Sequence, residues 1–179
     1  DELRLEAVPI FLEAAEWLHD QAPVAPRIAL CKGTNGLGEE IFRGREIVAM
    51  SDWEEASIGD PAADFASLQD LIPEIVRDGK TLWSLDHALD YYRSVSGIAV
   101  TRASVQFYQV FRALNTMVFS ANAARGVTEH GDATIRQAWT ATEVMHVAKR
   151  SLAAVMGLAP PLSASYYGEL NQTVEDSDA

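Results

Sequence analysis

The sequence has 179 residues, of which 48% are hydrophobic, and it carries a net charge of −12. The hydrophobic content excludes a disordered chain, and the length suits a single domain of ordinary size. Because nucleic acid and anionic membranes attract basic proteins, the acidic charge excludes both as expected partners. The chain has neither an apolar run of about 18 residues nor a signal peptide at its N-terminus, so we expect a cytoplasmic protein.

The first half of the chain predicts one helix followed by a small β region. Apolar residues at helical spacing follow Pro9, and the residues expected on the buried face are Val8, Phe11, Leu12, Ala15 and Leu18. The segment "RIALC" (27–31) predicts a strand, and "EEIFRGREIVAMSDW" (39–53) predicts two strands around a turn at 43–45. Cys31, the single cysteine, is expected to be a buried small hydrophobe.

From Asp60 onward the pattern is helical, so we expect an α+β fold that is mainly helical, with no further strands. Asp60 is the expected N-cap of a helix that has Pro61 at its first position and ends at Pro73. Another helix is expected from about Ser84 to Gly97. Two longer helices, at 101–126 and from 135 to about 157, should form most of the core. Residues 1–160 are expected to form the domain, and 161–179 a polar acidic tail.

A glycine-rich stretch, "LCKGTNGLGEEIF" (30–42), lies between the first predicted strand and the predicted hairpin. Its glycines are spaced G-x-x-G-x-G, and a strand follows them. Dinucleotide-binding and P-loop motifs have other spacings, and they need a helix N-terminus directly after the loop to bind phosphate. Both kinds of phosphate-binding loop are therefore excluded.

The segment from Lys32 to Asp64 resembles the C-terminal lobe of the aminoglycoside phosphotransferase family, which shares a protein-kinase-like fold with choline kinases. The family pattern is H-G-D-x-x-x-x-N, a hairpin, I-D-W-E and then G-D-P-x-x-D. The corresponding segments here are "KGTNGLGE" (32–39), "SDWE" (51–54) and "GDPAAD" (59–64), and "YYRSVSG" and "FYQVFRAL" are also similar to one large subgroup. The resemblance implies phosphoryl transfer from ATP or GTP, with Mg²⁺, to a small-molecule acceptor of unknown identity. It also implies an N-terminal lobe, which we expect to belong to a longer chain because the sequence shows no counterpart of it before Asp1.

The resemblance also implies roles for individual residues. Carboxylates are hard oxygen ligands that suit Mg²⁺, and phosphoryl transfer needs a group that orients the attacking hydroxyl. By position, the implied metal ligands are Asp52 and Glu39, the catalytic positions are Thr34 and Lys32, the nucleotide-site residues are Asn35 and Glu39, and the structural supports are Asp60 and Asp64. Three of these depart from the family: Lys32 replaces histidine, Thr34 replaces the catalytic aspartate, and Glu39 replaces the metal-binding asparagine.

These departures leave three hypotheses open. The chain is a small-molecule kinase, or a pseudokinase that binds a nucleotide or ligand without efficient catalysis, or a protein whose Lys32, Glu39 and Glu40 perform a different chemistry. A threonine hydroxyl cannot accept a proton at neutral pH as a carboxylate does, and losing a general base costs about 10²- to 10⁴-fold in rate. Elsewhere, Glu143 and His146 have the spacing of di-iron bundles, but the second such pair that a bundle needs is missing, so we expect no metal there.

Overall fold

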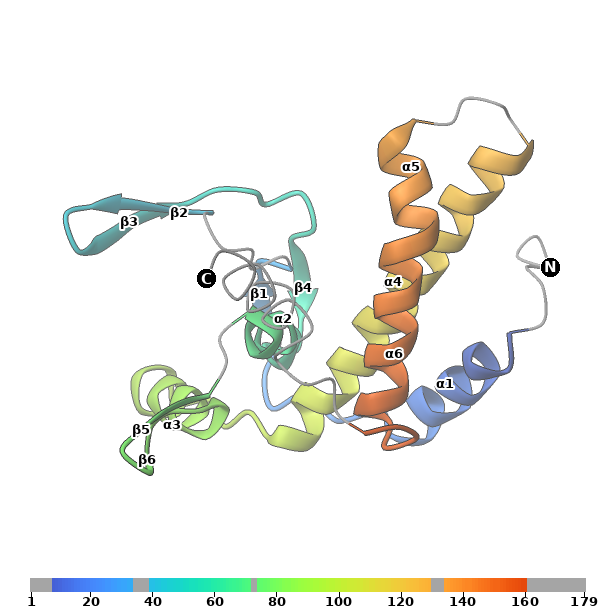
Figure 1. The fold of residues 1–179 in the computed structure, drawn as a ribbon. Coiled ribbons are helices and arrows are strands. Elements are labelled where there is room, and N and C mark those ends of the chain that lie inside the picture. The colour runs from blue at the N-terminus through green and yellow to red at the C-terminus, as the bar shows by residue number, and fades with distance from the viewer. Residues whose placement is uncertain (1–7, 34–38, 72–73, 130–133, 161–179) are drawn as a thin grey trace. The chain divides into compact units, whose positions relative to one another are not determined.

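The computed structural model describes residues 8–33, 39–71, 74–129 and 134–160. The predicted tail, 161–179, lies outside the described residues. The fold is α+β and mostly helical, as expected, and it divides into two compact units (Figure 1). One unit comprises the chain up to Gln21 and from Val110 onward, and the other comprises Ala22–Gln109. Within the described segments, no helix is both long and apolar enough to cross a membrane.

The first unit is a helical assembly. It contains α1 (Pro9–Asp20), the part of α4 (Arg102–Glu129) from Val110 onward, α5 (Ile135–Trp139), the π-helical turn η1 (Thr140–Val144) and α6 (Met145–Val155). Its buried cluster consists of Ala14, Val110, Met117, Ala148 and Leu152, so α4 and α6 supply most of this core, as predicted, and they run side by side in Figure 1. Pro9 occupies the first turn of α1, where its missing N–H costs nothing.

The predicted apolar faces of two helices in this unit are only partly correct. In α1, Phe11 and Leu18 of the predicted face pack against the buried cluster, but the buried residue is Ala14, whereas Leu12 is 68% exposed and Ala15 is also exposed. In the helix predicted from 135 to about 157, Ala148 and Leu152 are buried, whereas Ile135 is 91% and Trp139 56% exposed. The π-helical turn between α5 and α6 explains the second difference, because its wider turn shifts the helical phase.

The second unit combines short antiparallel strands with two helices. Strand β1 (Ala29–Cys31) pairs with β4 (Ser57–Gly59), and β2 (Glu40–Arg43) pairs with β3 (Glu46–Met50) around the predicted turn. Helix α2 (Ala62–Leu71) follows β4 directly, and α3 (Leu85–Ser96) ends at Gly97 in a left-handed conformation, as predicted. A second buried cluster contains Ala62, Leu89, Val100 and Val105.

The expectation that no strand follows Asp60 is wrong. Strands β5 (Ile75–Arg77) and β6 (Lys80–Trp83) form a third antiparallel hairpin. Its turn is Asp78-Gly79, in which both residues have positive φ (52° and 70°), as a two-residue hairpin turn of type I′ requires. The Asp-Gly pair between "IVR" and "KTLW" is therefore the hairpin signal that the helical interpretation overlooked.

Candidate functional site: the β1–β2 connection and the open end of the β2–β3 hairpin

Asp64, in the first turn of α2, fastens the chain that leaves β1. One oxygen of its carboxylate, Oδ2, accepts a hydrogen bond from the backbone N–H of Lys32 (3.0 Å), and Oδ1 accepts one from the N–H of Gly33 (2.9 Å). The two successive backbone N–H groups that follow β1 thus share one charged acceptor on a helix. This is the geometry that the resemblance implies for a supporting aspartate, and it fixes the start of the connection between β1 and β2.

Gly33 is held in a position that only glycine fits. Its φ is +90°, and a Cβ added there would lie 2.4 Å from the carbonyl oxygen of Glu55. The backbone after β1 therefore passes directly against the backbone before β4. The role of Glu55 in this contact was not predicted, because it depends on backbone approach and no side-chain pattern marks it.

Lys32 and Glu39 form an ion pair between the Nζ and Oε2 atoms. The Lys32 side chain is 5% exposed and that of Glu39 is 16% exposed, so this pair is largely shielded from water. The two residues stand at the two ends of the connection between β1 and β2, and the pair holds these ends together. Two predicted site residues of this connection, Thr34 and Asn35, lie outside the described residues.

At the open end of the β2–β3 hairpin, the backbone of Glu39 pairs with that of Ser51, the residue before Asp52. The carbonyl oxygen of Glu39 accepts hydrogen bonds from both the N–H (2.8 Å) and the Oγ hydroxyl (2.9 Å) of Ser51, so Asp52 follows the residue paired with Glu39. Asp52 is exposed and has a φ of 60°, a left-handed conformation that is uncommon outside glycine, asparagine and aspartate. The indole N–H of Trp53 donates to the Met50 carbonyl (2.8 Å), which fixes the turn around Asp52.

Asp60 is a buried polar residue that contacts the end of β1. The side chain of Asp60 is 3% exposed, and its Oδ1 accepts a hydrogen bond from the Ala62 N–H (2.9 Å), which is the helix-capping contact expected from the sequence. Among the described residues, its Oδ2 has no hydrogen-bond partner. The Cys31 thiol donates to the Asp60 carbonyl (3.3 Å).

Burial around Asp60 keeps two neighbouring groups protonated. Burial raises the pKa of Cys31, and the charges of Asp64 and then Asp60 add to this effect. Burial also raises the pKa of Tyr108, again with a contribution from Asp60. Cys31 is therefore a neutral thiol near pH 7, which agrees with its expected role as a buried small hydrophobe.

The resemblance implies that magnesium binds at the hairpin end, and the residues there can be compared with the ligands that this ion needs. Within the part of the chain that the structure describes, no three His, Cys, Asp or Glu residues converge on one metal position. Magnesium, however, is usually held by one or two protein carboxylates, and water and substrate phosphates complete its coordination. Asp52 is an exposed carboxylate at the hairpin end, whereas the Glu39 carboxylate is already bound to Lys32.

No protein-family model matches the chain, and neither does any curated protein. The resemblance to the phosphotransferase family therefore rests on the motif residues quoted above.

Proposed function

We propose that this chain carries the magnesium-nucleotide site of a kinase-like phosphotransferase, located at the open end of the β2–β3 hairpin. The observation that carries the proposal is the pair of hydrogen bonds from the Lys32 and Gly33 N–H groups to Asp64. Phosphoryl transfer depends almost entirely on positioning and electrostatics, so a kinase-like loop needs such a rigid support. A carboxylate that braces two successive N–H groups supplies it.

Asp52 is the proposed magnesium ligand. Its left-handed backbone conformation costs free energy for a residue with a Cβ, and strain of this kind concentrates at functional sites. The exposed carboxylate at the hairpin end is accessible to an ion that comes with a nucleotide. Magnesium bound there would neutralise charge on the nucleotide phosphates.

Lys32 and Glu39 are proposed to tune the charge of this site. Because the Lys32 ammonium already neutralises the Glu39 carboxylate, the net charge near the metal position is less negative than two free carboxylates would make it. Lys32 is largely buried and bound to Glu39, so we assign it a positioning role in place of the catalytic role that the motif position suggests. Asp52 then provides most of the attraction for the cation.

The same ion pair favours a second candidate, a pseudokinase that binds a nucleotide without efficient transfer. In this candidate the Glu39 carboxylate is bound to the Lys32 ammonium and is therefore not available as a second metal ligand. Thr34 supplies no general base. Restoring the family residues by Thr34→Asp together with Glu39→Asn separates the possibilities. If the chain is a pseudokinase, phosphoryl transfer should rise in this double variant. If the chain has a different native chemistry, the double variant should lose that native activity.

The nucleotide site is tested by paramagnetic relaxation with Mn²⁺ as a substitute for Mg²⁺, in the presence of ATP. Mn²⁺ should selectively broaden the backbone amide signals of Ser51 and Trp53, which flank Asp52. Asp52→Asn removes the charge but keeps a residue that tolerates positive φ, so the broadening should disappear without a change in fold. Asp78→Asn is the matched control, because Asp78 also has positive φ but lies in the β5–β6 turn. Broadening that persists in Asp52→Asn, or that Asp78→Asn abolishes equally, would overturn the proposed site.

A further inference from the structure

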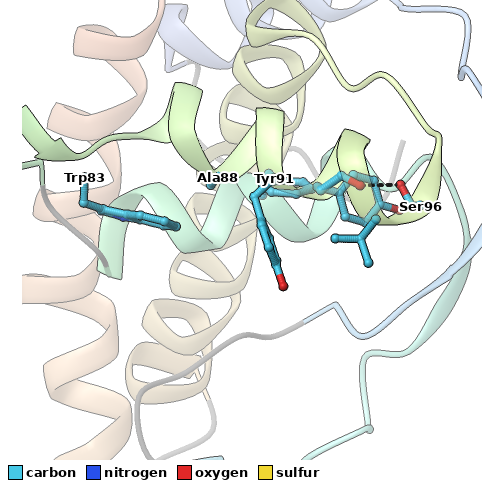
Figure 2. A pocket seen from close by; sticks show the side chains of 7 residues that line it. Trp83, Ala88, Tyr91 and Ser96 are labelled. Carbon is cyan, nitrogen blue, oxygen red and sulfur yellow. Dashed lines mark hydrogen bonds between the residues drawn. The ribbon is translucent and has the colours of Figure 1, made fainter.

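The Ala22–Gln109 unit contains an open groove of about 520 Å³, which is formed by α2, β6 and α3. Figure 2 shows Ala88 between Trp83 and Tyr91, with Ser96 at the end of α3. The remaining wall residues are Phe65, Tyr92 and Val95. None of the residues proposed to bind magnesium belongs to this groove.

A small residue, Ala88, lies between two large aromatic residues of the groove wall. Ala88 is buried (6% exposed) and leaves room between the larger Trp83 and Tyr91. One wall is well ordered by contact between rings, since Phe65 and Tyr92 pack edge to face with centroids 5.2 Å apart and ring planes at 75°. Filling this space with a larger side chain at position 88 should therefore block it.

The chemistry of the wall is aromatic and uncharged. None of the residues that line the groove is acidic or basic. The Ser96 hydroxyl already donates to the Tyr92 carbonyl (2.7 Å) and accepts from the Ile98 N–H (3.1 Å), so its hydrogen-bonding capacity is largely used. An anionic ligand would lose its hydration here and would meet the negative faces of the aromatic rings, whereas a flat apolar group can stack on them.

We propose that this groove binds a small molecule that carries an aromatic or aliphatic ring and no negative charge. Its volume falls within the range of about 300–1,000 Å³ that is typical of small-molecule sites. This site does not depend on the proposed phosphotransferase function.

The proposal is tested with N-phenyl-1-naphthylamine, an uncharged two-ring fluorophore, titrated into the chain. We expect saturable binding of one molecule per chain, at least tenfold weaker in Ala88→Leu because the added side chain fills the centre of the groove. Ala15→Leu is the matched control, since Ala15 is exposed on α1 in the other unit, and it should bind like the unchanged chain. The related sulfonate, 1-anilinonaphthalene-8-sulfonate, should bind several-fold more weakly.

Tyr91→Ala provides a second variant that does not depend on repacking, because Tyr91 is 70% exposed. It should weaken binding of the neutral fluorophore and leave the circular dichroism spectrum unchanged. Absence of saturable binding, or equal affinity in the unchanged chain, Ala88→Leu and Tyr91→Ala, would overturn the proposal. Another outcome in sedimentation is that the fluorophore binds only when the chain dimerises, and that Tyr91→Ala abolishes both binding and dimerisation. This result would assign the groove to a second copy of the chain and would also overturn the proposal. Equal or tighter binding of the sulfonate would overturn the exclusion of anionic ligands.

Discussion

The Lys32 ammonium is bound to the Glu39 carboxylate, and this ion pair connects the residue after β1 to the residue before β2. Both side chains are shielded from water, although the Glu39 side chain retains some contact with solvent. The phosphotransferase pattern has histidine and asparagine at these positions, so the pair is a property of this chain. Its energetic contribution can be measured separately from any activity.

Removing one member of this pair should destabilise the protein. Lys32→Met leaves the Glu39 carboxylate without its counterion in a poorly solvated position, and we expect a loss on the order of 2 kcal/mol in the free energy of unfolding, between the values for exposed and fully buried pairs. Adding Glu39→Gln should recover part of this loss. Urea denaturation of the unchanged chain, both single variants and the double variant measures the coupling energy. Effects that add to within about 0.5 kcal/mol would show that the two side chains do not stabilise each other.

The bracing of the loop by Asp64 predicts a graded stability series. Asp64→Ala leaves the N–H groups of Lys32 and Gly33 without their acceptor, at a cost of about 1–3 kcal/mol. Asp64→Asn keeps one carbonyl acceptor for the two donors and should fall between alanine and the unchanged chain. Chemical denaturation gives this order, and hydrogen exchange should be accelerated at the Lys32 and Gly33 amides. If Asp64→Ala were as stable as the unchanged chain, with the same exchange rates, the two hydrogen bonds would contribute nothing.

The close approach at Gly33 predicts an effect larger than that of backbone conformation alone. Gly33→Ala must both adopt a positive φ and move its Cβ away from the Glu55 carbonyl, so we expect it to lose more than about 2 kcal/mol or to unfold the loop. Gly44→Ala is the control, because Gly44 also has positive φ (65°) but has open space around its Cβ position. It should cost only about 1 kcal/mol. Equal losses in the two variants would contradict the contact with Glu55.

The raised pKa of Cys31 predicts low reactivity and a specific pH dependence. Burial and the nearby acidic groups hold the thiol neutral, so iodoacetamide should alkylate Cys31 slowly at pH 8 in the folded chain and rapidly in urea. Because the pKa is higher in the folded state, the unfolded chain loses its proton first as the pH rises. The stability that the neutral thiol contributes is thus complete below the unfolded value, about 8.5, and is lost as the pH rises through the folded value.

Denaturation midpoints measured between pH 7.5 and 10 for the unchanged chain and for Cys31→Ala test this dependence. The unchanged chain should lose stability across this range more steeply than the variant. A steeper loss in Cys31→Ala, or fast alkylation of the folded chain, would show that the thiol is accessible and ionises readily.

The sequence was most informative where local rules determine the structure. Pro9, Asp60 and Gly97 correctly mark helix ends, because capping and backbone conformation depend on a few neighbouring residues. The β2–β3 hairpin followed from the alternation around Gly44. The β5–β6 hairpin was equally visible in the pair Asp78-Gly79, but residues 74–83, between two predicted helices, were assigned no strand.

Other features depend on contacts that a sequence does not display. Pairing of β1 with β4 joins segments separated by the whole β2–β3 hairpin, and the contact of Gly33 with Glu55 follows from that pairing. The exposure of Trp139 follows from the π-helical turn, whose wider spacing periodicity alone does not reveal. At the candidate site, the positions of Asp52 and Asp64 came from the motif, whereas the ion pair between Lys32 and Glu39 required the folded chain.

Binding of a magnesium nucleotide at the hairpin end through Asp52 can be measured directly by calorimetric titration. ATP and GTP should each be titrated with and without Mg²⁺ into the unchanged chain, Asp52→Asn and the control Asp78→Asn. We expect binding that requires Mg²⁺, is weakened at least tenfold by Asp52→Asn and is unchanged in Asp78→Asn. Absence of nucleotide binding in every condition, or Mg²⁺-dependent binding that Asp52→Asn leaves intact, would contradict the proposed site.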